Sequence, residues 1–398
     1  MMKSQNFLTA CLLGAIFSTA HSQSAEIKVT NPSNISRPKE PVIVLWSQLP
    51  NNGGLQGKPL KLTDEKGMSV PFQIDDLNQD GTQDELTFQS DFLPKQQRSF
   101  SLTISSSGEL WKNHPHTDAA NWKKIDTVYR SIDDDDGPGL LRSQSSYRFD
   151  GVGWESELVG YRVYLDERNS VDIQGKRKPG LQWNYIGASS VDYQQDSYWG
   201  MDVLHVGPAL GVGGIALWAG DSAVKPYLLD RRRCRIIARG PVRAVVRVDY
   251  FGWKLGTGRV DLTSLFTIYS GDRATEHQVF LSPGASSRTL ATGIVKHAKA
   301  KATWDGQQSR LSTFGPQSRA NDELLMSLHF NRNDVLKKTE DAINHLVLLR
   351  LESNSSIRFV ISSRWKGEKD VSWSDKDLED FDMSIWRRLH EPLNIRVQ

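Results

Sequence analysis

Acid–base side chains gather in a glycine-rich segment between Tyr198 and Trp218. Asp202 and His205 lie within it, and the glycines that follow leave little side-chain bulk to obstruct a ligand. An imidazole titrates near neutral pH, so His205 is a candidate general base. The competing interpretation is a structural histidine that is hydrogen-bonded to a turn carbonyl.

A second polar stretch places two carboxylates close to a phenol and a guanidinium. If Glu155 to Val163 form one strand, then Glu155, Glu157 and Tyr161 share one face. Arg162 then lies on the other face, because side chains alternate along a strand. Tyr161 is a candidate acid, and Glu155 and Arg162 are candidate substrate ligands. A polar sheet face exposed to water is the competing interpretation.

Two further pairs of residues add cations and rings. Lys296 and His297 follow a short apolar run, and Arg364 and Trp365 end another. Adjacent residues of a strand point to opposite faces, so Lys296 and His297 are not expected to face the same cleft. His297 is a second candidate acid, while Lys296 and Arg364 are candidate partners of a substrate carboxylate.

Tryptophan is unusually frequent, with 12 in 398 residues. Aromatic faces stack on sugar rings. Trp154, Trp199, Trp218 and Trp365 lie in or beside the polar stretches described above. Their positions therefore indicate a carbohydrate cleft.

Two acidic segments contain oxygen ligands for a cation. From Asp76, such residues alternate up to Gly81 as in the front half of a calcium loop, but the twelfth position is Thr87 rather than a bidentate glutamate. The second segment is the run from Asp133 to Asp136. We predict that both are solvated turns and that the protein holds no metal or other cofactor.

Short runs of β-branched and aromatic residues, separated by turn residues, connect these stretches. Helical periodicity is limited to Asp334–Asn344 and Asp375–Arg388. The sequence therefore predicts an all-β protein with few helices, in which a small β-sandwich precedes a large, supersandwich-like antiparallel β-sandwich. We place the small domain at residues 23–110 and the main domain at residues 111–398, because a polar segment after residue 104 interrupts the strand pattern.

The N-terminus predicts export. Residues 1–22 contain a lysine, an apolar run and small residues, as a signal peptide does. A lipoprotein signal at Cys11 is the alternative. No later stretch is long and apolar enough to span a bilayer, so we expect a protein secreted across the inner membrane to the periplasm or the medium. Cleavage leaves Cys234 as the one cysteine, which excludes an intrachain disulfide.

Composition and missing motifs exclude several classes of protein. The 49 Lys and Arg residues are balanced by 47 Asp and Glu residues, so no basic field for nucleic acid exists. The sequence has no Gly-x-Ser-x-Gly elbow, no His-Glu-x-x-His helix and no dinucleotide fingerprint. Serine esterases, zinc proteases and nicotinamide enzymes are therefore disfavoured.

The ordered set of motifs resembles the exported family known as domain of unknown function 4861. The motifs are residues 78–86, 154–157, 198–218 and 292–297, and the most specific one is the His-Val-Gly-Pro-Ala-Leu-Gly-Val-Gly-Gly segment that begins at His205. The resemblance implies a β-sandwich carbohydrate-active protein that acts in the degradation of acidic plant or algal polysaccharides. It also implies a relation to oligosaccharide dehydratases of ulvan and pectin breakdown.

We therefore expect a carbon–oxygen lyase whose partner is an acidic oligosaccharide that contains uronic acid. In a dehydratase, His205 removes the C5 proton and Tyr161 or His297 protonates the departing 4-hydroxyl. The cation that neutralises the carboxylate is one of three, namely Arg162, Lys296 or Arg364. In a polysaccharide lyase, a sugar leaves instead of water.

Two alternatives remain open. A glycoside hydrolase would pair Glu155 with Asp202, and a non-catalytic binding protein would use tryptophans without an acid–base pair. The candidate substrate-binding residues under these hypotheses are Trp154, Glu155, Arg162, Trp199, Asp202, Lys296, Arg364 and Trp365.

Overall fold

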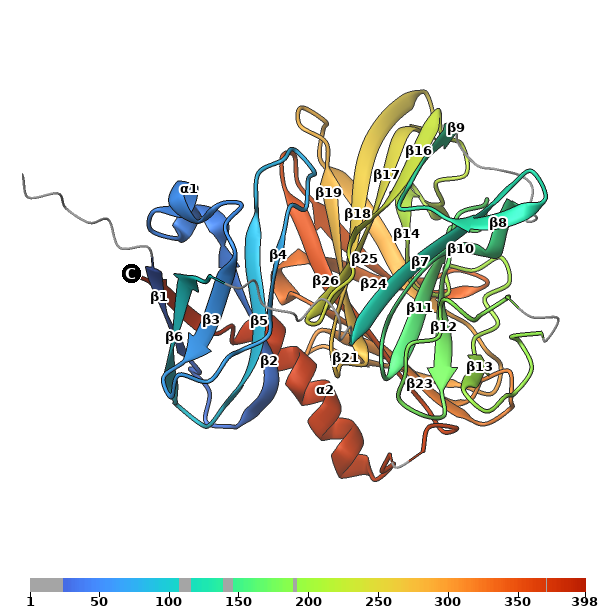
Figure 1. Cartoon of the computed structure of the whole chain (residues 1–398). Helices are drawn as coiled ribbons and strands as arrows, with labels where there is room; N and C mark the ends of the chain where they lie inside the picture. Colours follow the sequence, from blue (N-terminus) through green and yellow to red (C-terminus); the bar gives the residue numbers. More distant parts are fainter. Residues whose placement is uncertain (1–23, 107–115, 139–145, 189–191, 370) are drawn as a thin grey trace, which may run out of the picture.

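The computed structural model describes residues 24–106, 116–138, 146–188, 192–369 and 371–398. Antiparallel strands dominate these residues and form a small sandwich and a large one (Figure 1). The predicted all-β class with few helices is confirmed. The predicted signal peptide lies outside the described residues. Within the described ranges, no helix is long and apolar enough to cross a membrane.

The small sandwich packs a four-stranded sheet against a three-stranded sheet. Alternate residues such as Ile27, Val42 and Phe88 point inward and form one apolar cluster. Its last strand comes from the C-terminus and pairs with the first, so the two ends of the described chain lie side by side (Figure 1). The four-stranded sheet is β27 (Asn394–Val397), β1 (Ser24–Thr30), β6 (Gln97–Ile104) and β3 (Leu60–Asp64). The three-stranded sheet is β2 (Arg37–Leu45), β5 (Glu85–Phe92) and β4 (Phe72–Asp75), and the short helix α1 (Asn52–Leu55) lies between β2 and β3 in the chain.

The large sandwich contains three sheets. The nine-stranded sheet is β21 (Lys301–Asp305), β22 (Arg310–Pro316), β23 (Glu323–Phe330), β26 (Ser356–Trp365), β19 (Ala274–Leu281), β18 (Gly258–Tyr269), β17 (Arg243–Leu255), β16 (Arg231–Ala238) and β9 (Asp134–Pro138). The six-stranded sheet is β13 (Gly200–Asp202), β12 (Val171–Lys176), β11 (Val159–Tyr164), β10 (Tyr147–Ser156), β7 (Thr117–Ile125) and β8 (Val128–Ser131). The five-stranded sheet is β15 (Ser222–Val224), β14 (Val212–Ala219), β20 (Arg288–Val295), β25 (Asn344–Leu351) and β24 (Val335–Glu340).

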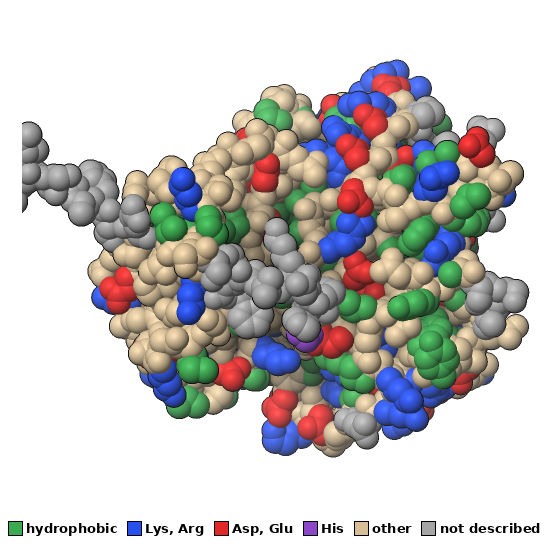
Figure 2. Space-filling view, in the orientation of Figure 1, with side chains coloured by type: hydrophobic (Ala, Val, Ile, Leu, Met, Phe, Trp, Pro, Cys, Tyr) green, Lys and Arg blue, Asp and Glu red, His purple; other side chains and the backbone are tan. Residues whose placement is uncertain are grey.

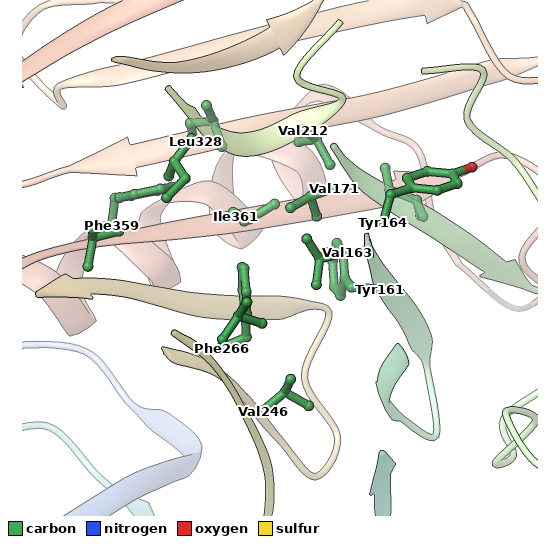
Figure 3. Packing of buried hydrophobic residues seen from close by; sticks show 14 of the residues in the cluster. Tyr161, Val163, Tyr164, Val171, Val212, Val246, Phe266, Leu328, Phe359 and Ile361 are labelled. Atoms are coloured by element: carbon green, nitrogen blue, oxygen red, sulfur yellow. The ribbon is translucent and has the colours of Figure 1, made fainter. Parts of the chain in front are cut away.

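One apolar core fills the large sandwich. The nine-stranded sheet packs against both smaller sheets, with β17 in contact with β10 and β23 in contact with β14. Val171 and Val212 of the smaller sheets lie together with Phe266 and Ile361 of the large one (Figure 3). Because these inner faces are committed to packing, polar chemistry is left to the outer faces and the connecting loops.

The predicted C-terminal helix is confirmed as α2 (Asp375–His390). The Ser374 hydroxyl accepts a hydrogen bond from the Asp377 backbone at 3.2 Å, and basic residues occupy the last turn. Ile385 packs on Val360 of β26, so the helix covers part of the outer face of the nine-stranded sheet.

The second predicted helix, Asp334–Asn344, is wrong. A short 3-10 turn (Arg332–Asp334) leads into β24, which pairs with the apolar strand β25 at the edge of the five-stranded sheet. The charged side chains of β24 face solvent, as is common for an edge strand, and their spacing mimicked the polar face of a helix.

The two acidic segments differ from each other. The Asp76 segment is a hairpin turn between β4 and β5, and the Asp76 carboxylate accepts hydrogen bonds from its own turn at 2.8 and 3.2 Å. The run Asp133–Asp136 is not a solvated turn, because it enters edge strand β9 and each carboxylate meets a cation. These pairs are Asp133–Arg239, Asp134–Arg233, Asp135–Lys123 and Asp136–Arg231.

Candidate functional site

Residues 155–163 form a hairpin rather than one strand. A two-residue turn joins β10 to β11, so Trp154 pairs with Tyr161 and Glu155 pairs with Gly160. Tyr161 therefore lies on the face opposite to Glu155. This corrects the expectation that the phenol and the carboxylate share a face, because the turn reverses the chain between them.

Trp154 and Tyr161 lie in the core of the large sandwich, and each is 0% exposed. The Trp154 indole donates to the Thr275 hydroxyl at 2.9 Å, and the Tyr161 hydroxyl donates to the Arg273 carbonyl oxygen at 2.6 Å. Burial raises the pKa of the Tyr161 phenol. A phenol without solvent access is not placed to protonate a substrate, and a buried indole does not stack on a sugar, so both assignments are corrected.

Arg162 organises a cluster of buried charges on the outer face of the six-stranded sheet. Its Nη2 atom donates to the carboxylates of Asp172 and Asp202, the latter at 3.1 Å. Nη2 also donates to the Tyr164 hydroxyl at 2.5 Å, and Nη1 donates to the Tyr193 hydroxyl at 3.2 Å. The guanidinium and both carboxylates are fully buried. We call Arg162, Asp172, Asp202, Tyr164 and Tyr193 the Arg162 cluster.

Within the Arg162 cluster, the pKa of the Asp202 carboxyl lies near neutral pH. Burial raises its pKa to about 7, the Asp172 carboxylate adds to the rise, and Arg162 and Arg319 oppose it. Arg319 donates to the other Asp202 oxygen at 3.3 Å, and its side chain is 21% exposed. Arg319 thus connects the buried cluster to the surface, and Asp202 is able to exchange a proton near neutral pH.

Glu155 forms a separate buried ion pair with Lys176, with 2.5 Å between Oε2 and Nζ. Its other oxygen accepts hydrogen bonds from the backbone of Gln182 and Trp183 at 2.7 and 2.8 Å. Burial raises the pKa of Glu155 and lowers that of Lys176. The pair fastens the segment after β12 onto the sheet, so Glu155 is a structural residue and not the free carboxylate that the sequence indicated.

Several buried polar atoms beside these charges have no partner among the described residues. They are both amide atoms of Gln174, Nε of Arg162 and Nε1 of Trp183. The Trp183 ring lies directly on the sheet, since a Cβ on Gly153 would fall 2.2 Å from it. Buried polar groups are ordinarily hydrogen-bonded, so this face is where water or a polar ligand would be held.

The structure brings His205 and His297 together. His205 is exposed in the loop between β13 and β14, and His297 follows β20. Burial lowers the pKa of His297, the charge of His205 lowers it further, and a hydrogen bond with the His205 backbone opposes both. The Nε2 atom of His297 is buried and has no partner in the described part of the chain. The contact therefore offers two imidazoles, one of which has a free nitrogen.

The other predicted residues do not join the histidines. Lys296 turns away and donates to the Asp341 carbonyl oxygen at 2.5 Å. Arg364 is buried beside α2, and its guanidinium donates to a carbonyl oxygen of the loop before the helix at 2.9 Å, whereas Trp365 is buried in the core of the large sandwich. Trp199 is half-buried against a small aromatic cluster. Burial removes Arg364 and Trp365 from the carbohydrate cleft that their residue types indicated, whereas Lys296 and Trp199 are partly exposed but engage other partners.

Sequence reasoning missed several members of this region. Asp172, Gln174 and Lys176 alternate with apolar residues along β12, so they share the face of Arg162. That strict alternation was a readable signal of a polar strand face. Arg319 gave no such signal, because it lies in a turn that only the tertiary structure brings to Asp202. No group of three or more His, Cys, Asp or Glu suited to a metal occurs in the described ranges.

Comparisons place the chain among known proteins. A family model described as Domain of unknown function (DUF4861) matches residues 29–395. Uncharacterized protein P7 of Formosa agariphila is 22% identical over an alignment that covers 96% of each chain.

Two solved structures share less sequence identity with this chain than the Formosa agariphila protein does. An alpha-mannosidase from Enterococcus faecalis V583 has a TM-score of 0.48 at 8% identity, and a protein in glycosyl hydrolase family 38 from Enterococcus faecalis has a TM-score of 0.46 at 9% identity. Both alignments cover 94% of this chain, but they cover 46% and 47% of the other chains. The chain thus spans about half the length of these proteins, and overlap at this level does not carry an activity to it.

Proposed function

The chain belongs to the domain of unknown function 4861 family, and we propose that it is an exported carbon–oxygen lyase that acts on oligosaccharides containing a uronic acid. The contact between His205 and His297 is the observation that carries the proposal. The reaction removes water, or a sugar, from C4 and leaves an unsaturated uronyl residue. Export through residues 1–22 would place the protein in the periplasm or the medium, where polysaccharide fragments occur.

β-Elimination needs a base and an acid beside the same sugar ring. Two adjacent imidazoles supply both, because protonation of one disfavours protonation of the other. The lowered pKa of His297 keeps its imidazole neutral, and its Nε2 atom has no partner among the described residues, so we assign His297 as the base that takes the C5 proton. Unlike Tyr161, His297 is only partly buried, and this role requires that substrate binding uncovers its Nε2 atom. His205 then gives a proton to the oxygen that leaves C4, while the C5–H electrons form the C4–C5 double bond. These roles are the reverse of those that the sequence indicated.

Loss of the C5 proton also requires a cation at the carboxylate of the sugar. Arg319 is the best-placed arginine, because Leu204 pairs with Ser318 and the Arg319 backbone donates to Val203 at 2.9 Å, two residues before His205. Its internal partner is Asp202, whose pKa of about 7 permits protonation near neutral pH. A neutral Asp202 would release Arg319 to the substrate. We propose Arg319 for this role in place of the three cations that the sequence offered.

Product analysis tests the function. Purified protein is incubated with oligosaccharides that end in glucuronate or galacturonate, and absorbance, mass and chain length are followed. Ultraviolet absorbance of the new double bond with loss of one water and no shortening identifies a dehydratase. Absorbance with shortening identifies a lyase. New reducing ends without absorbance would identify a hydrolase, and binding without product would identify a non-catalytic protein; either result overturns the proposal.

Histidine variants test the assignment. His205→Ala and His297→Ala should each abolish most turnover while the melting temperature stays close to that of the parent protein. His116→Ala is the matched control, because His116 is exposed directly before β7 and its replacement should leave turnover unchanged. If both variants at the paired positions turn over substrate at the parental rate, the acid–base assignment is wrong.

A further inference from the structure

A cavity of about 800 Å³ lies between the small sandwich and the outer face of the nine-stranded sheet. Outward residues of β16 to β19 form its floor. The turn at Leu77 and Asn78 and the loops around residues 282–283 and 354–356 form its walls. None of the elements that carry the Arg162 cluster or the two histidines contributes to it. The proposed lyase reaction therefore gives this cavity no role.

Three arginines line the floor. Arg233 and Arg235 point outward from β16, and Arg247 points outward from β17 directly opposite Arg235. Like charges at directly opposed positions repel each other. Figure 2 shows that Lys and Arg side chains alternate with Asp and Glu along the neighbouring edge, where β16 and β9 lie in Figure 1.

The counter-charges on this floor are fewer than the cations. Arg233 pairs with Asp134 at 2.5 Å. Arg235 and Arg247 share the single carboxylate of Asp249, each at 2.8 Å. Glu85 lies on the wall but is engaged by Arg243 at 2.7 Å. Arg235 and Arg247 thus share a single carboxylate, whereas Arg243 pairs with both Glu85 and Asp75, so the carboxylates around the cavity are unevenly distributed among the arginines.

Arg235 supplies a second sign of an incomplete site. Its side chain is 8% exposed, and its Nε atom is buried without a partner among the described residues. A buried guanidinium ordinarily satisfies its donors, because an unmade charge-assisted hydrogen bond is costly. An anion would supply an acceptor for this donor and a second negative charge for the two arginines that share Asp249.

Apolar surface flanks the arginines. Phe251 follows Asp249 on the same face of β17, and Phe280 lies across the sheet on β19. Thr263 and Gln278 add hydroxyl and amide groups between them. A floor of this kind fits a ring that has apolar C–H faces, hydroxyl groups and one acidic group. The volume is within the range of small-ligand sites, roughly 300 to 1,000 Å³.

We propose that this cavity binds an anionic saccharide, with one carboxylate or sulfate group against Arg235 and Arg247 and the sugar ring against Phe251 or Phe280. The choice of a saccharide as carrier of the anion rests on the proposed function, whereas the anion site itself does not. The cavity binds and does not react, because its described lining contains no His, Lys, Tyr or Cys and its Asp249 is held by two arginines. It would hold a part of the substrate distant from the histidines.

Calorimetric titration tests the site in His297→Ala protein, so that ligand is not consumed. The ligand is a short oligogalacturonate, and the matched ligand is its methyl ester, which lacks the charge. Arg247→Gln should weaken binding of the acid by about 10-fold or more, since a charge-assisted hydrogen bond is lost. The methyl ester should bind weakly to every variant. Arg358→Gln is the control, because Arg358 lies on the same sheet, pairs with Glu276 and does not line the cavity.

A second variant separates binding from a folding defect. Asp249→Asn removes the internal competitor for both arginines, so it should tighten binding of the acid, whereas a folding defect would weaken it. Equal affinity of the parent and Arg247→Gln proteins, or equal affinity for the acid and its ester, overturns the inference. Binding of inorganic sulfate at Arg247 without binding of any oligosaccharide overturns the saccharide assignment.

The two proposals fail in different ways. If no oligosaccharide is turned over but binding still depends on Arg247, the lyase proposal falls and the anion site stands. If turnover occurs and the affinity for the acid is the same in the parent and Arg247→Gln proteins, the anion site is wrong and the lyase proposal stands.

Discussion

Arg162 and Asp202 form an ion pair at 3.1 Å in which both side chains are fully buried. The same guanidinium also holds Asp172, so both buried carboxylates share Arg162, and Asp202 has a further contact with the partly exposed Arg319. An ion pair of this kind adds little net stability as a unit, but loss of one partner leaves an uncompensated buried charge. The pair is therefore a sensitive place to test the structure.

Replacement of Arg162 by Met should destabilise the protein by roughly 3 to 5 kcal/mol, because Asp172 and Asp202 lose their shared cation. Denaturant unfolding of the purified variant measures the change. Arg350→Met is the control, since Arg350 is 58% exposed and lies 3.8 Å from Glu352, and its loss should change the free energy of unfolding by less than about 1 kcal/mol. A similar small change at Arg162 would contradict the buried cluster.

Asp202 should make stability depend on pH. Its folded pKa is about 7, whereas the pKa of an unfolded aspartate is about 4. Between about pH 4 and about pH 7 the folded protein thus binds more protons than the unfolded chain, so the contribution of Asp202 to the free energy of unfolding falls as pH rises through this window. Asp202→Asn removes that slope.

Unfolding of both proteins at about pH 5 and about pH 8 measures the effect. The stability of the Asn variant relative to the parent should increase toward the higher pH. Parallel pH dependence of the two proteins would show that the Asp202 carboxyl titrates as an ordinary aspartate.

The pKa of His297 should depend on the neighbouring His205. The charge of His205 helps to hold the pKa of His297 below its usual value, so His205→Asn should raise the pKa of His297. NMR titration of the imidazole signals measures this without any substrate. His116→Asn is the control and should leave the His297 signal unchanged. An identical His297 titration in all three proteins would place the rings too far apart to share a reaction.

Gly153 should tolerate no side chain. A Cβ there would lie 2.2 Å from the Trp183 ring, which covers the outer face of the six-stranded sheet. Gly153→Ala should therefore displace Trp183 and destabilise the protein by roughly 1 to 3 kcal/mol, the usual range for overpacking. Thermal unfolding and tryptophan fluorescence measure the two effects. Gly53→Ala is the control, because nothing lies within 4 Å of its added Cβ.

Face assignments show where sequence reasoning succeeds and fails. Alternation along β12 is visible in the sequence and does place Asp172, Gln174 and Lys176 on one face. The turn at residues 157–158 contains no Gly, Pro or Asn that would mark it in the sequence. Strand alternation counted from Glu155 through this turn therefore predicts the wrong face of the sheet for Tyr161. Because this short turn reverses the chain, Tyr161 lies in the core and not in the cleft that the sequence predicts.

The sequence by itself determined the all-β class and α2, because strand alternation, turn residues and the Ser374 cap act over a few neighbouring residues. Only the tertiary structure decided that Trp154 and Tyr161 are core, that Arg162 is buried with two carboxylates, and that His205 meets His297. These relationships join residues that are distant in the chain. The periodicity of the sequence predicts on which face of a strand a side chain lies. Only the packing of the sheets determines whether that face contacts another sheet, contacts a loop or is exposed to solvent.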